Sequence, residues 1–479
     1  MYKTKPFKHQ EVVIDDSWER PYYGLFMEMG LGKSKVAIDT VGKLKLKGEI
    51  DSVMIVAPKG VYDNWIKQEI PNHLPEEFER FVVRWQPSTS KAFQDQMQKL
   101  VFEMMAGIKF FVINVEAFSS DRGKKAAYYF LKKNPDNMMI VDESTTIKNR
   151  KASRTKNIMQ LGKYAKYKRI LTGSPVTKSP MDLYSQCAFL DAMSLDQASF
   201  FAFQNRYAIV QKRIMGPRSF NEITGYRRLD ELNEKLNKFS VRTLKEDCLD
   251  LPDKIYVKRN VPLTAEQTKL YTQMKKYALA QLDEGQLATT ASVLTQIMRL
   301  QQICCGYLVS DEGEMKVLDN NRMTELLAAI EECSGKIIIW CNYTHDIIEI
   351  EKALSSKYGG DSVATYYGGT KQDDRQQTVD NFQDINNPLR FFVGQPKTGG
   401  YGITLTAANT MIYYSNSYDL EIRLQSEDRA HRIGQKKAVT YIDLIVEDTI
   451  DEKIVKSLRE KINLAGQVLG EEQKRWLLN

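Results

Sequence analysis

Short apolar runs and amphipathic stretches alternate along the first third of the chain. The apolar runs are SVMIVAP (52–58), KFFVINV (109–115), MMIVDE (138–143) and KRILTGS (168–174). Apolar or β-branched runs separated by polar stretches of helical periodicity are typical of a parallel sheet covered by helices on both faces. The pattern therefore predicts an α/β lobe over residues 1–177.

A second series of apolar runs lies in the last third of the chain. It comprises KIIIWCN (336–342), SVATYYGG (362–369), LRFFVGQ (389–395), TMIYYSN (410–416) and TYIDLIV (440–446). Helical patterns such as THDIIEIEKALSSKYG lie between these runs. The same reasoning predicts a second α/β lobe over residues 336–448.

The region between the two series has few strand-like runs and several long helical ones. We interpret residues 178–258 as a helical insertion of the first lobe, and 259–335 as a helical insertion that precedes the second lobe. The last stretch, 449–479, again has helical periodicity. The predicted fold class is α/β, with two parallel-sheet lobes, helical insertions and a C-terminal helix.

Length and composition agree with this division. A chain of 479 residues exceeds one core, because domains usually contain about 100–200 residues. No apolar run approaches the roughly 18 residues of a membrane span, and the N-terminus MYKTKPFKHQ lacks the apolar core of a signal peptide. We therefore expect a cytoplasmic protein that binds no membrane. The six cysteines and four histidines are scattered, which favours ordinary thiols over a zinc site.

The formal charge of +7 is a mild basic excess, and its distribution is more informative than its size. Basic residues cluster in KLKLK (43–47), KNRKASRTK (148–156) and KYAKYKR (163–169). Such clusters occur on solvated helix faces, and they also form the surfaces that bind nucleic acid. Both interpretations stay open on charge alone.

The stretch MEMGLGKS has the form of a phosphate-binding loop, although the general pattern has glycine where this chain has Met27. Gly30 and Gly32 allow successive backbone N–H groups to point into one concavity. Lys33 supplies a cation for the β- and γ-phosphates, and Ser34 supplies a hydroxyl for Mg²⁺. A strand-like run precedes the stretch and a helical run follows it. The alternative is a glycine turn without a ligand.

An acidic pair ends the third apolar run, in MMIVDEST. Asp142 is predicted to hold Mg²⁺ through its hydration shell, and Glu143 to orient and deprotonate the attacking water. A surface acidic turn is the alternative interpretation. The pair follows a GKS loop within one predicted parallel lobe, which favours a nucleotide-hydrolysis site.

A third element lies in the second lobe, in YDLEIRLQSEDRAHRIGQKK. Arg429 and Arg432 are three residues apart and share one face of a helical turn. Triphosphate hydrolysis requires cationic stabilisation of the charge that develops on the phosphate oxygens, as arginine fingers provide. The alternative is the start of a basic surface helix.

Together these stretches resemble the motifs of the Swi/Snf-type ATPases of helicase superfamily II, in order and over almost the whole chain. KPFKHQ resembles the adenine-reading element, MGLGKS motif I, IVAPKGVYDNWIKQEI motif Ia, DEST with IKN motif II, and LTGSP motif III. KTGGYGITLTAANTMIYYS resembles motif V, and QSEDRAHRIGQ, the most family-specific string, resembles motif VI. The resemblance implies two RecA-like lobes, helical protrusions, a C-terminal brace helix, ATP with Mg²⁺ as cofactors, and double-stranded DNA as partner.

The resemblance also implies roles for individual residues. The residues expected to bind ATP are Gln10, Gly30, Leu31, Gly32, Lys33, Ser34 and Gln425, and the catalytic ones are Lys33, Glu143, Arg429 and Arg432. Mg²⁺ is assigned to Ser34 and Asp142. The residues expected to contact DNA are Pro58, Lys59, Trp65, Thr398, Gly399, Gly400 and Thr404. The residues expected to couple the two activities are Thr145, Thr172, Gly173 and Ser174, and Thr145 stands where the family usually has histidine.

Three functions remain open from the sequence. The favoured one is a compact double-stranded DNA translocase of bacterial or viral type, monomeric and associated with the nucleoid or with viral DNA. It would remodel DNA or protein–DNA complexes in repair, recombination or replication, and single-stranded or branched DNA are further substrates to test. The second is a strand-separating DNA or RNA helicase. The third, from another class, is a nucleotide-gated DNA clamp with little turnover.

Overall fold

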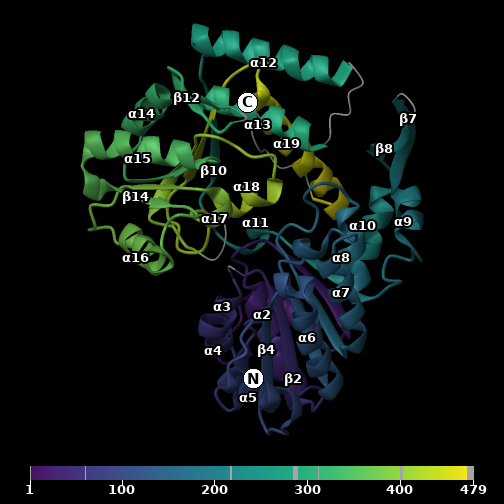
Figure 1. Ribbon diagram of the computed structural model, residues 1–479. Coiled ribbons are helices and arrows are strands. Elements are labelled where there is room, and N and C mark those ends of the chain that lie inside the picture. Colours follow the sequence, from purple (N-terminus) through teal and green to yellow (C-terminus); the bar gives the residue numbers. More distant parts are fainter. Residues whose placement is uncertain are drawn as a thin grey trace. The chain divides into compact units, whose positions relative to one another are not determined.

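The computed structural model describes residues 2–59, 61–215, 218–283, 290–310, 312–399 and 403–471. These residues form two compact units (Figure 1). Among the described residues, unit 1 contains 2–212, 221–250 and 464–471, and unit 2 contains the others.

Unit 1 is built on a seven-stranded sheet whose strand pairs are all parallel. The spatial order is β3-β4-β2-β5-β6-β1-β9. The strands are β1 (Tyr22–Met27), β2 (Ser52–Ala57), β3 (Arg80–Arg84), β4 (Ile108–Asn114), β5 (Asn137–Asp142), β6 (Tyr167–Leu171) and β9 (Ser240–Thr243). The four apolar runs predicted as strands in this lobe form β2, β4, β5 and β6.

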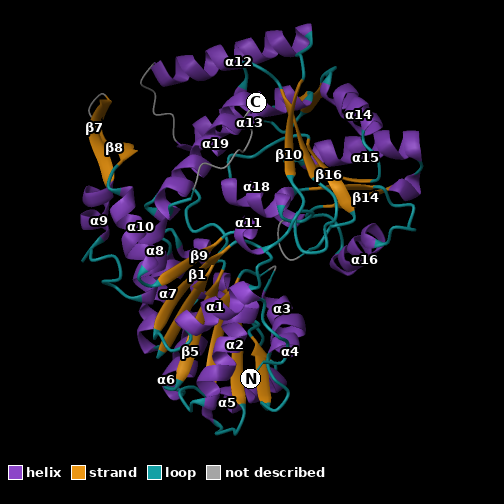
Figure 2. Cartoon of the chain, turned by 180° about the vertical axis from the view of Figure 1, so that it is seen from behind, coloured by secondary structure: helices purple, strands orange, loops and turns teal. Residues whose placement is uncertain are grey.

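Helices cover both faces of this sheet (Figure 2). The helices of unit 1 are α1 (Lys8–Ser17), α2 (Lys33–Leu46), α3 (Tyr62–Asn64), α4 (Ile70–His73), α5 (Lys91–Phe102), α6 (Asp121–Lys133), α7 (Ser153–Leu161), α8 (Asp182–Leu190), α9 (Phe200–Tyr207), α10 (Leu229–Asn237) and α11 (Lys245–Cys248). Short helical turns span Trp65–Glu69, Val115–Ser119, Ser144–Ile147 and Gly162–Tyr164.

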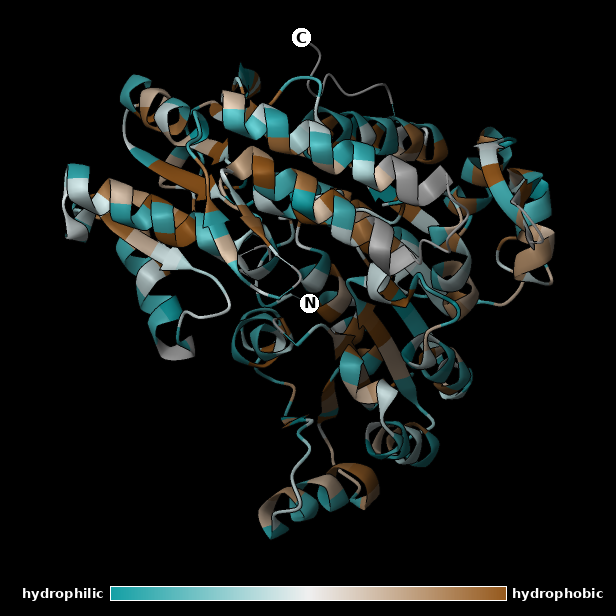
Figure 3. Ribbon diagram, turned by 45° about the horizontal axis from the view of Figure 1, so that its top comes forward, coloured by the Kyte–Doolittle hydropathy of each residue, from teal (hydrophilic) through white to brown (hydrophobic). Residues whose placement is uncertain are grey.

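Strand β2 shows why its sequence is continuously apolar. Met54 and Val56 pack in the core beneath α5 to α8, whereas Val53 and Ile55 pack in the core beneath α1, α2 and α4. Successive strand residues point to opposite faces, so a strand covered on both sides has no polar face. In Figure 3, strands coloured as hydrophobic lie beside helices that carry both hydrophobic and hydrophilic residues.

Unit 2 contains a six-stranded parallel sheet with the order β10-β17-β16-β13-β15-β14. Its strands are β10 (Lys254–Asn260), β13 (Lys336–Trp340), β14 (Val363–Tyr366), β15 (Phe391–Gly394), β16 (Ala408–Tyr413) and β17 (Val439–Ile445). Its helices are α12 (Ala265–Asp283), α13 (Thr290–Cys305), α14 (Arg322–Glu332), α15 (Thr344–Tyr358), α16 (Gln372–Gln383), α17 (Pro396–Gly399) and α18 (Leu420–Glu427), with a short turn at Gly360–Ser362. The predicted class, two parallel-sheet α/β lobes with helices, is confirmed.

The region 178–335 contains more strand than its hydrophobic pattern predicts. Strand β9 extends the first sheet and β10 extends the second. The strands β7 (Ala208–Met215) and β8 (Arg218–Tyr226) pair with each other, as do β11 (Tyr307–Val309) and β12 (Met315–Val317). β9 and β10 are edge strands with half-buried side chains, so they lack the continuous apolar run by which the central strands were recognised.

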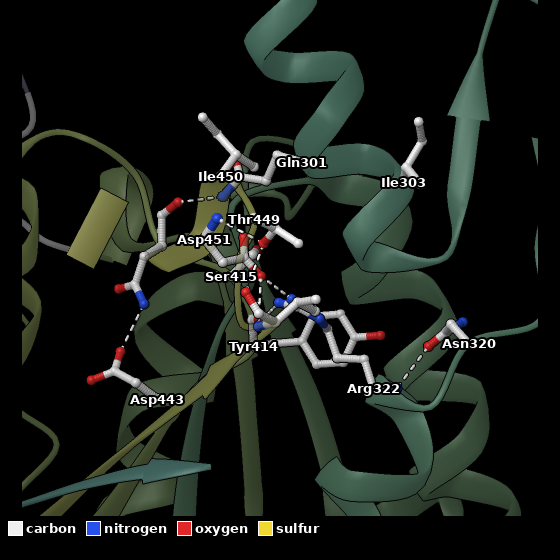
Figure 4. Close-up of polar contacts among 12 residues, drawn as sticks. Gln301, Ile303, Asn320, Arg322, Tyr414, Ser415, Asp443, Thr449, Ile450 and Asp451 are labelled. Atoms are coloured by element: carbon white, nitrogen blue, oxygen red, sulfur yellow. Dashed lines mark hydrogen bonds and ion pairs between the residues drawn. The ribbon is translucent and has the colours of Figure 1, made fainter. Parts of the chain in front are cut away.

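The C-terminal helix α19 (Ile450–Leu469) confirms the predicted helical ending. In unit 2 its first turn is held by Arg322, a fully buried residue of α14 whose guanidinium pairs with Asp451 and donates to the Tyr414 carbonyl (Figure 4). The Ile450 N–H donates to the Tyr271 hydroxyl at 2.8 Å. In unit 1, Val468 packs in the main core. No helix among the described residues is long and apolar enough to cross a membrane.

Candidate nucleotide site

The sheet order of unit 1 brings three predicted motifs to one edge. Strands β5, β6 and β1 are neighbours, and parallel strands present their carboxyl ends at the same edge of a sheet. Asp142 ends β5, Thr172 follows β6, and the predicted phosphate loop follows β1. Ligands of open α/β sheets bind at this edge, so the topology supports the grouping that the sequence predicts.

The phosphate loop has the backbone that its glycines were expected to provide. Gly30 and Gly32 have φ of 84° and 80°, and α2 begins directly afterwards at Lys33. A Cβ on Gly32 would lie 2.3 Å from Gln10 Nε2. Met27 is the last residue of β1 and is fully buried. It lies within the strand, before the loop bends, which explains why glycine is dispensable there.

Gln10 holds the loop from the side. Its Oε1 accepts the Phe7 N–H at 3.0 Å, and its Nε2 donates to the Leu31 carbonyl at 3.0 Å. His9 Nε2 lies 3.1 Å from the same carbonyl, and Leu31 itself is fully buried. Both ends of the Gln10 amide therefore bind protein atoms in this structure, and the residue braces the loop.

Lys33 and Asp142 are electrostatically linked. Lys33 Nζ donates to the Met27 carbonyl at 3.0 Å, and Ser34 is half-buried in the first turn of α2. Burial raises the pKa of Asp142 above its usual range, while the Trp65 N–H, the Lys33 charge and its own neighbour's N–H oppose that shift. The site thus holds a buried carboxylate whose ionised form depends on nearby donors and charge.

Glu143 has an unusual backbone. Its φ of 46° and ψ of 62° are left-handed, a conformation that non-glycine residues rarely adopt. Its N–H donates to Asp142 Oδ1 at 3.0 Å, and the side chain is largely buried. Thr145 is buried in the helical turn that follows. This conformation ends the strand and changes the direction of the backbone. The side chains of Asp142 and Glu143 therefore do not point to opposite faces of the sheet as successive strand residues would.

The predicted coupling segment lies against the phosphate loop. A Cβ on Gly173 would come within 3.2 Å of the Met29 side chain and 3.3 Å of its backbone nitrogen. The Thr172 N–H donates to the Leu25 carbonyl at 3.2 Å, and Thr172 Oγ1 accepts the Ser174 N–H at 3.2 Å. Gly173 therefore permits a close approach between the two loops.

A second connection joins this segment to the acidic turn through a residue that the sequence did not single out. Ser144 Oγ donates to Gln186 Oε1 at 2.7 Å, and Gln186 Nε2 donates to the Pro175 carbonyl at 2.8 Å. Gln186 is fully buried in α8. A polar residue within the apolar stretch of that helix was the available signal, because buried amides require partners.

The prediction that Trp65 contacts DNA is corrected by its burial. Its indole is fully buried, and Nε1 donates to Asp142 Oδ2 at 2.8 Å. The residue therefore contacts the carboxylate of Asp142 and does not reach the surface. Pro58 is also buried, whereas Lys59 is exposed at the end of β2.

In unit 2 the motif VI residues lie on and just after α18. Arg429 is buried, and its guanidinium donates to the Gln425 carbonyl at 2.9 Å and to the Ile403 carbonyl at 3.0 Å. Arg432 is half-buried and lies 3.5 Å from the same Ile403 carbonyl, so it is the more accessible of the pair. Gln425 is buried, and its Oε1 accepts no hydrogen bond from the part of the chain that the structure describes.

A buried charge network fastens α18 to the sheet. Arg423 donates to both oxygens of Asp443 in β17, at 2.5 and 3.0 Å, and to Glu427 Oε1 at 2.9 Å. Lys254 and Tyr256 of β10 bind Glu427 Oε2 at 3.2 and 2.8 Å. Burial by itself raises the pKa of Glu427, but Lys254 and Arg423 outweigh it and bring that pKa down to about 2. These residues position the helix that carries Gln425.

The structure describes some of the predicted motif V residues. Thr398 and Gly399 end α17, and a Cβ on Gly399 would lie 2.7 Å from the Trp340 ring. Thr404 is half-buried. Gly400 lies outside the described residues. The small size of Gly399 is thus required by packing against Trp340, independently of any nucleic acid.

Two family models match the chain. The SNF2-related domain matches residues 24–307, and the helicase conserved C-terminal domain matches residues 320–434. The chain is 27% identical over 466 residues to the SWI/SNF chromatin-remodeling complex subunit snf22 of Schizosaccharomyces pombe, covering 92% of this chain and 26% of the relative. It is 28% identical over 351 residues to the putative ATP-dependent helicase/translocase YwqA of Bacillus subtilis, covering 71% and 36%.

Among solved structures, the Sulfolobus solfataricus SWI2/SNF2 ATPase core in complex with dsDNA matches with 23% identity and a TM-score of 0.44, covering 95% of this chain and 90% of that one. The chain spans 26% and 36% of the length of the two curated relatives named above. The SNF2-related match alone covers more than half of the chain, and this protein therefore belongs to the SNF2-related family.

Proposed function

We propose that this chain is an ATP-hydrolysing motor that steps along double-stranded DNA. One observation carries the proposal: a glycine-dependent loop with Lys33 and Ser34 shares a sheet edge with the buried pair Asp142 and Glu143. The family assignment and the helicase and translocase names of the relatives support it. We place the core of lobe 1 at residues 1–177 and that of lobe 2 at 336–448, followed by the C-terminal helix; the insertions between them are not purely helical, because β9 extends the first sheet and β10 extends the second.

The residues of unit 1 have distinct tasks in this proposal. Backbone N–H groups of the loop and the N-terminus of α2 hold the phosphates, and Lys33 neutralises them. Glu143 accepts a proton from the attacking water and orients it toward the terminal phosphorus. Glu143 directly follows β5 and has a left-handed backbone. Arg429 and Arg432 of unit 2 are assigned to the charge that develops on the phosphates.

The donor set fits Mg²⁺. Ser34 supplies a hydroxyl oxygen and Asp142 a carboxylate, and magnesium prefers one or two such ligands together with water and substrate phosphates. Both Asp142 oxygens already accept one hydrogen bond, from Trp65 and from the Glu143 N–H, which fixes the orientation of the carboxylate. When bound, the ion would neutralise charge on the phosphate oxygens.

Replacing Trp65 with phenylalanine tests the support of Asp142. The substitution removes the Nε1–H that stabilises the carboxylate, so the already raised pKa of Asp142 increases further. Since the ionised form is the one that serves the metal, the acidic limb of the ATPase pH profile is expected to move to higher pH. Trp85→Phe, at a buried indole packed on Phe93 and Phe111, controls for lost ring volume. An unmoved acidic limb would show that Trp65 only fills space.

DNA binding is proposed to involve backbone phosphates. Lys59, Thr398, Gly399, Gly400 and Thr404 offer a cation, hydroxyls and small residues, and such groups hold a phosphodiester without reading bases. A motor that moves along DNA of any sequence must bind it without contacts that depend on the bases. Binding that depends on phosphates weakens as salt rises. We further propose that the motor is a monomer, acts at the nucleoid or on viral DNA, and remodels DNA or protein–DNA complexes in repair, recombination or replication.

The test is ATP hydrolysis with duplex DNA, single-stranded DNA and RNA, together with triplex displacement. Stimulation by duplex of at least about tenfold over the other polymers, declining steeply between about 50 and 200 mM salt, is expected. Displacement of a triplex strand under ATP would demonstrate stepping. Unwinding of a fork without triplex displacement would favour a strand-separating helicase, and nucleotide-dependent DNA binding without turnover would favour a clamp.

A further inference from the structure

Arg242, in edge strand β9, makes contacts that no predicted motif accounts for. β9 pairs with β1, in the register Phe26 to Arg242, so it borders the strand from which the phosphate loop emerges. Arg242 Nη1 donates to the Phe26 carbonyl at 3.1 Å and to the Gly173 carbonyl at 3.0 Å. One guanidinium nitrogen therefore joins the root of the phosphate loop to the segment predicted to couple hydrolysis to DNA.

The segment from β9 to α11 also binds Glu28, the first residue of the phosphate loop. The Glu28 N–H donates to the Thr243 carbonyl at 3.0 Å, and Glu28 Oε2 accepts the Lys245 N–H at 2.9 Å. Arg242 Nη2 lies 3.7 Å from Glu28 Oε1. The backbone and the carboxylate of Glu28 are thus both fixed by the segment that continues from β9 into α11.

The fourth partner of Arg242 follows helix α19. Glu471 Oε1 accepts from Arg242 Nε at 2.6 Å, and both side chains are largely buried, with 8% and 14% of their surface exposed. The ion pair at Nε orients the guanidinium so that Nη1 faces the Phe26 and Gly173 carbonyls. Within unit 1, the segment after α19 therefore lies one side chain away from the phosphate loop.

We propose that Arg242 is a positioning residue of the nucleotide site, which locks the Gly173 segment to the root of the phosphate loop and is itself oriented by Glu471. The inference rests on the proposed ATPase function and deepens it. Arg242 touches neither the nucleotide nor the water in this assignment, because its contacts are to protein carbonyls and carboxylates. Arg242 holds the phosphate loop and the Gly173 segment at a constant separation, so that a movement of one segment displaces the other.

Arginine is required here because of its shape. Its planar fork makes several bonds in fixed directions, whereas lysine offers one compact charge. In Arg242→Lys the charge remains, but the single ammonium nitrogen cannot lie both beside Glu471, where Nε now lies, and at the two carbonyls, where Nη1 now lies. The variant therefore separates the geometric role from the mere presence of a buried cation.

The experiment measures hydrogen exchange and ATP turnover in Arg242→Lys. Exchange of peptides covering residues 172–176 should rise by about tenfold, since charged hydrogen bonds are worth more than neutral ones. The maximal DNA-stimulated rate should fall about tenfold with the KM for ATP changed by less than about twofold, because the phosphate-binding groups are intact. Arg206→Lys, which alters a two-point pair with Glu231 elsewhere in unit 1, should change neither quantity.

Glu471→Gln provides a second variant that keeps Arg242 in place. Exchange over 172–176 should rise by about threefold, a smaller effect, because a neutral acceptor remains. Unchanged exchange in folded Arg242→Lys, or in Glu471→Gln if the lysine variant does not fold, would overturn the inference. A wild-type protein without DNA-stimulated ATPase would instead contradict the proposed function, while the exchange result would still decide the connection between the loops.

Discussion

Replacing Glu143 with glutamine is expected to lower the maximal rate of ATP hydrolysis by about a hundredfold to ten-thousandfold, the usual contribution of a general base. Glutamine preserves the shape of the side chain and its donor-acceptor reach, yet cannot take the proton of the attacking water. The affinity for ATP should change by less than about threefold, because the loop that holds the phosphates is untouched. Single-turnover hydrolysis and equilibrium nucleotide binding measure the two quantities separately.

Glu116 provides the control for that substitution. It is an exposed glutamate that follows β4 in the same sheet, and it accepts from Asn114 at 2.9 Å. Glu116→Gln should leave hydrolysis within about twofold of the wild type, as surface changes usually do. A Glu143→Gln protein that hydrolyses ATP at the normal rate would remove Glu143 from the role of base.

The second large effect is expected on stability, at Asp443 in β17. Asp443→Asn removes the carboxylate that now binds two nitrogens of the buried Arg423 guanidinium, so that Glu427 is the one charged partner left among those described above. Disrupting one partner of a buried ion pair usually costs about 3–5 kcal/mol. Native-state hydrogen exchange over β16 and β17 should show a loss of that size, and the position of α18 should be disturbed as well.

An exposed pair in the same unit provides the comparison. Glu349 and Lys352 form a surface ion pair at 2.7 Å, and Glu349→Gln should cost less than about 1 kcal/mol because water screens exposed charges. Equal effects of the two substitutions would show that the Asp443 network contributes no more than a surface pair.

Glu427 gives this network a pH dependence of known sign. Its pKa falls from 4.5 to about 2 in the folded protein, so the ionised form is favoured by folding. The stabilisation is complete above the unfolded value of 4.5 and is lost as the pH falls toward 2. Unit 2 should therefore become less stable with acid within that interval, and exchange over β17 should reveal it.

Local sequence predicted the backbone and the strand ends that carry the candidate site. The loop glycines need positive φ, the acidic pair ends an apolar strand, and parallel strands share their carboxyl edge. Those rules depend on near neighbours along the chain, and Gly30, Gly32, Lys33 and Asp142 occupy the predicted positions in unit 1. Asp443 lies within the apolar run TYIDLIV, which indicates a buried carboxylate that needs a partner. The run does not indicate which residue is that partner.

The position of Trp65 could not be predicted from its residue type. Its residue type suits both a core and a nucleic-acid surface, and only packing decided that the indole is buried with Asp142 as its acceptor. Gln10 is similar, because its two partners come from Phe7 nearby and from Leu31 across the fold.

Local patterns along the chain were enough to predict the central strands, the two lobes and the side chains available at each loop. They did not predict which distant groups meet, such as Arg242 with Gly173 and Glu471, or Ser144 with Gln186. The physical reason is that periodicity and turn chemistry are set by residues a few positions apart, whereas a buried hydrogen bond between remote segments depends on sheet order and packing, which no local pattern encodes.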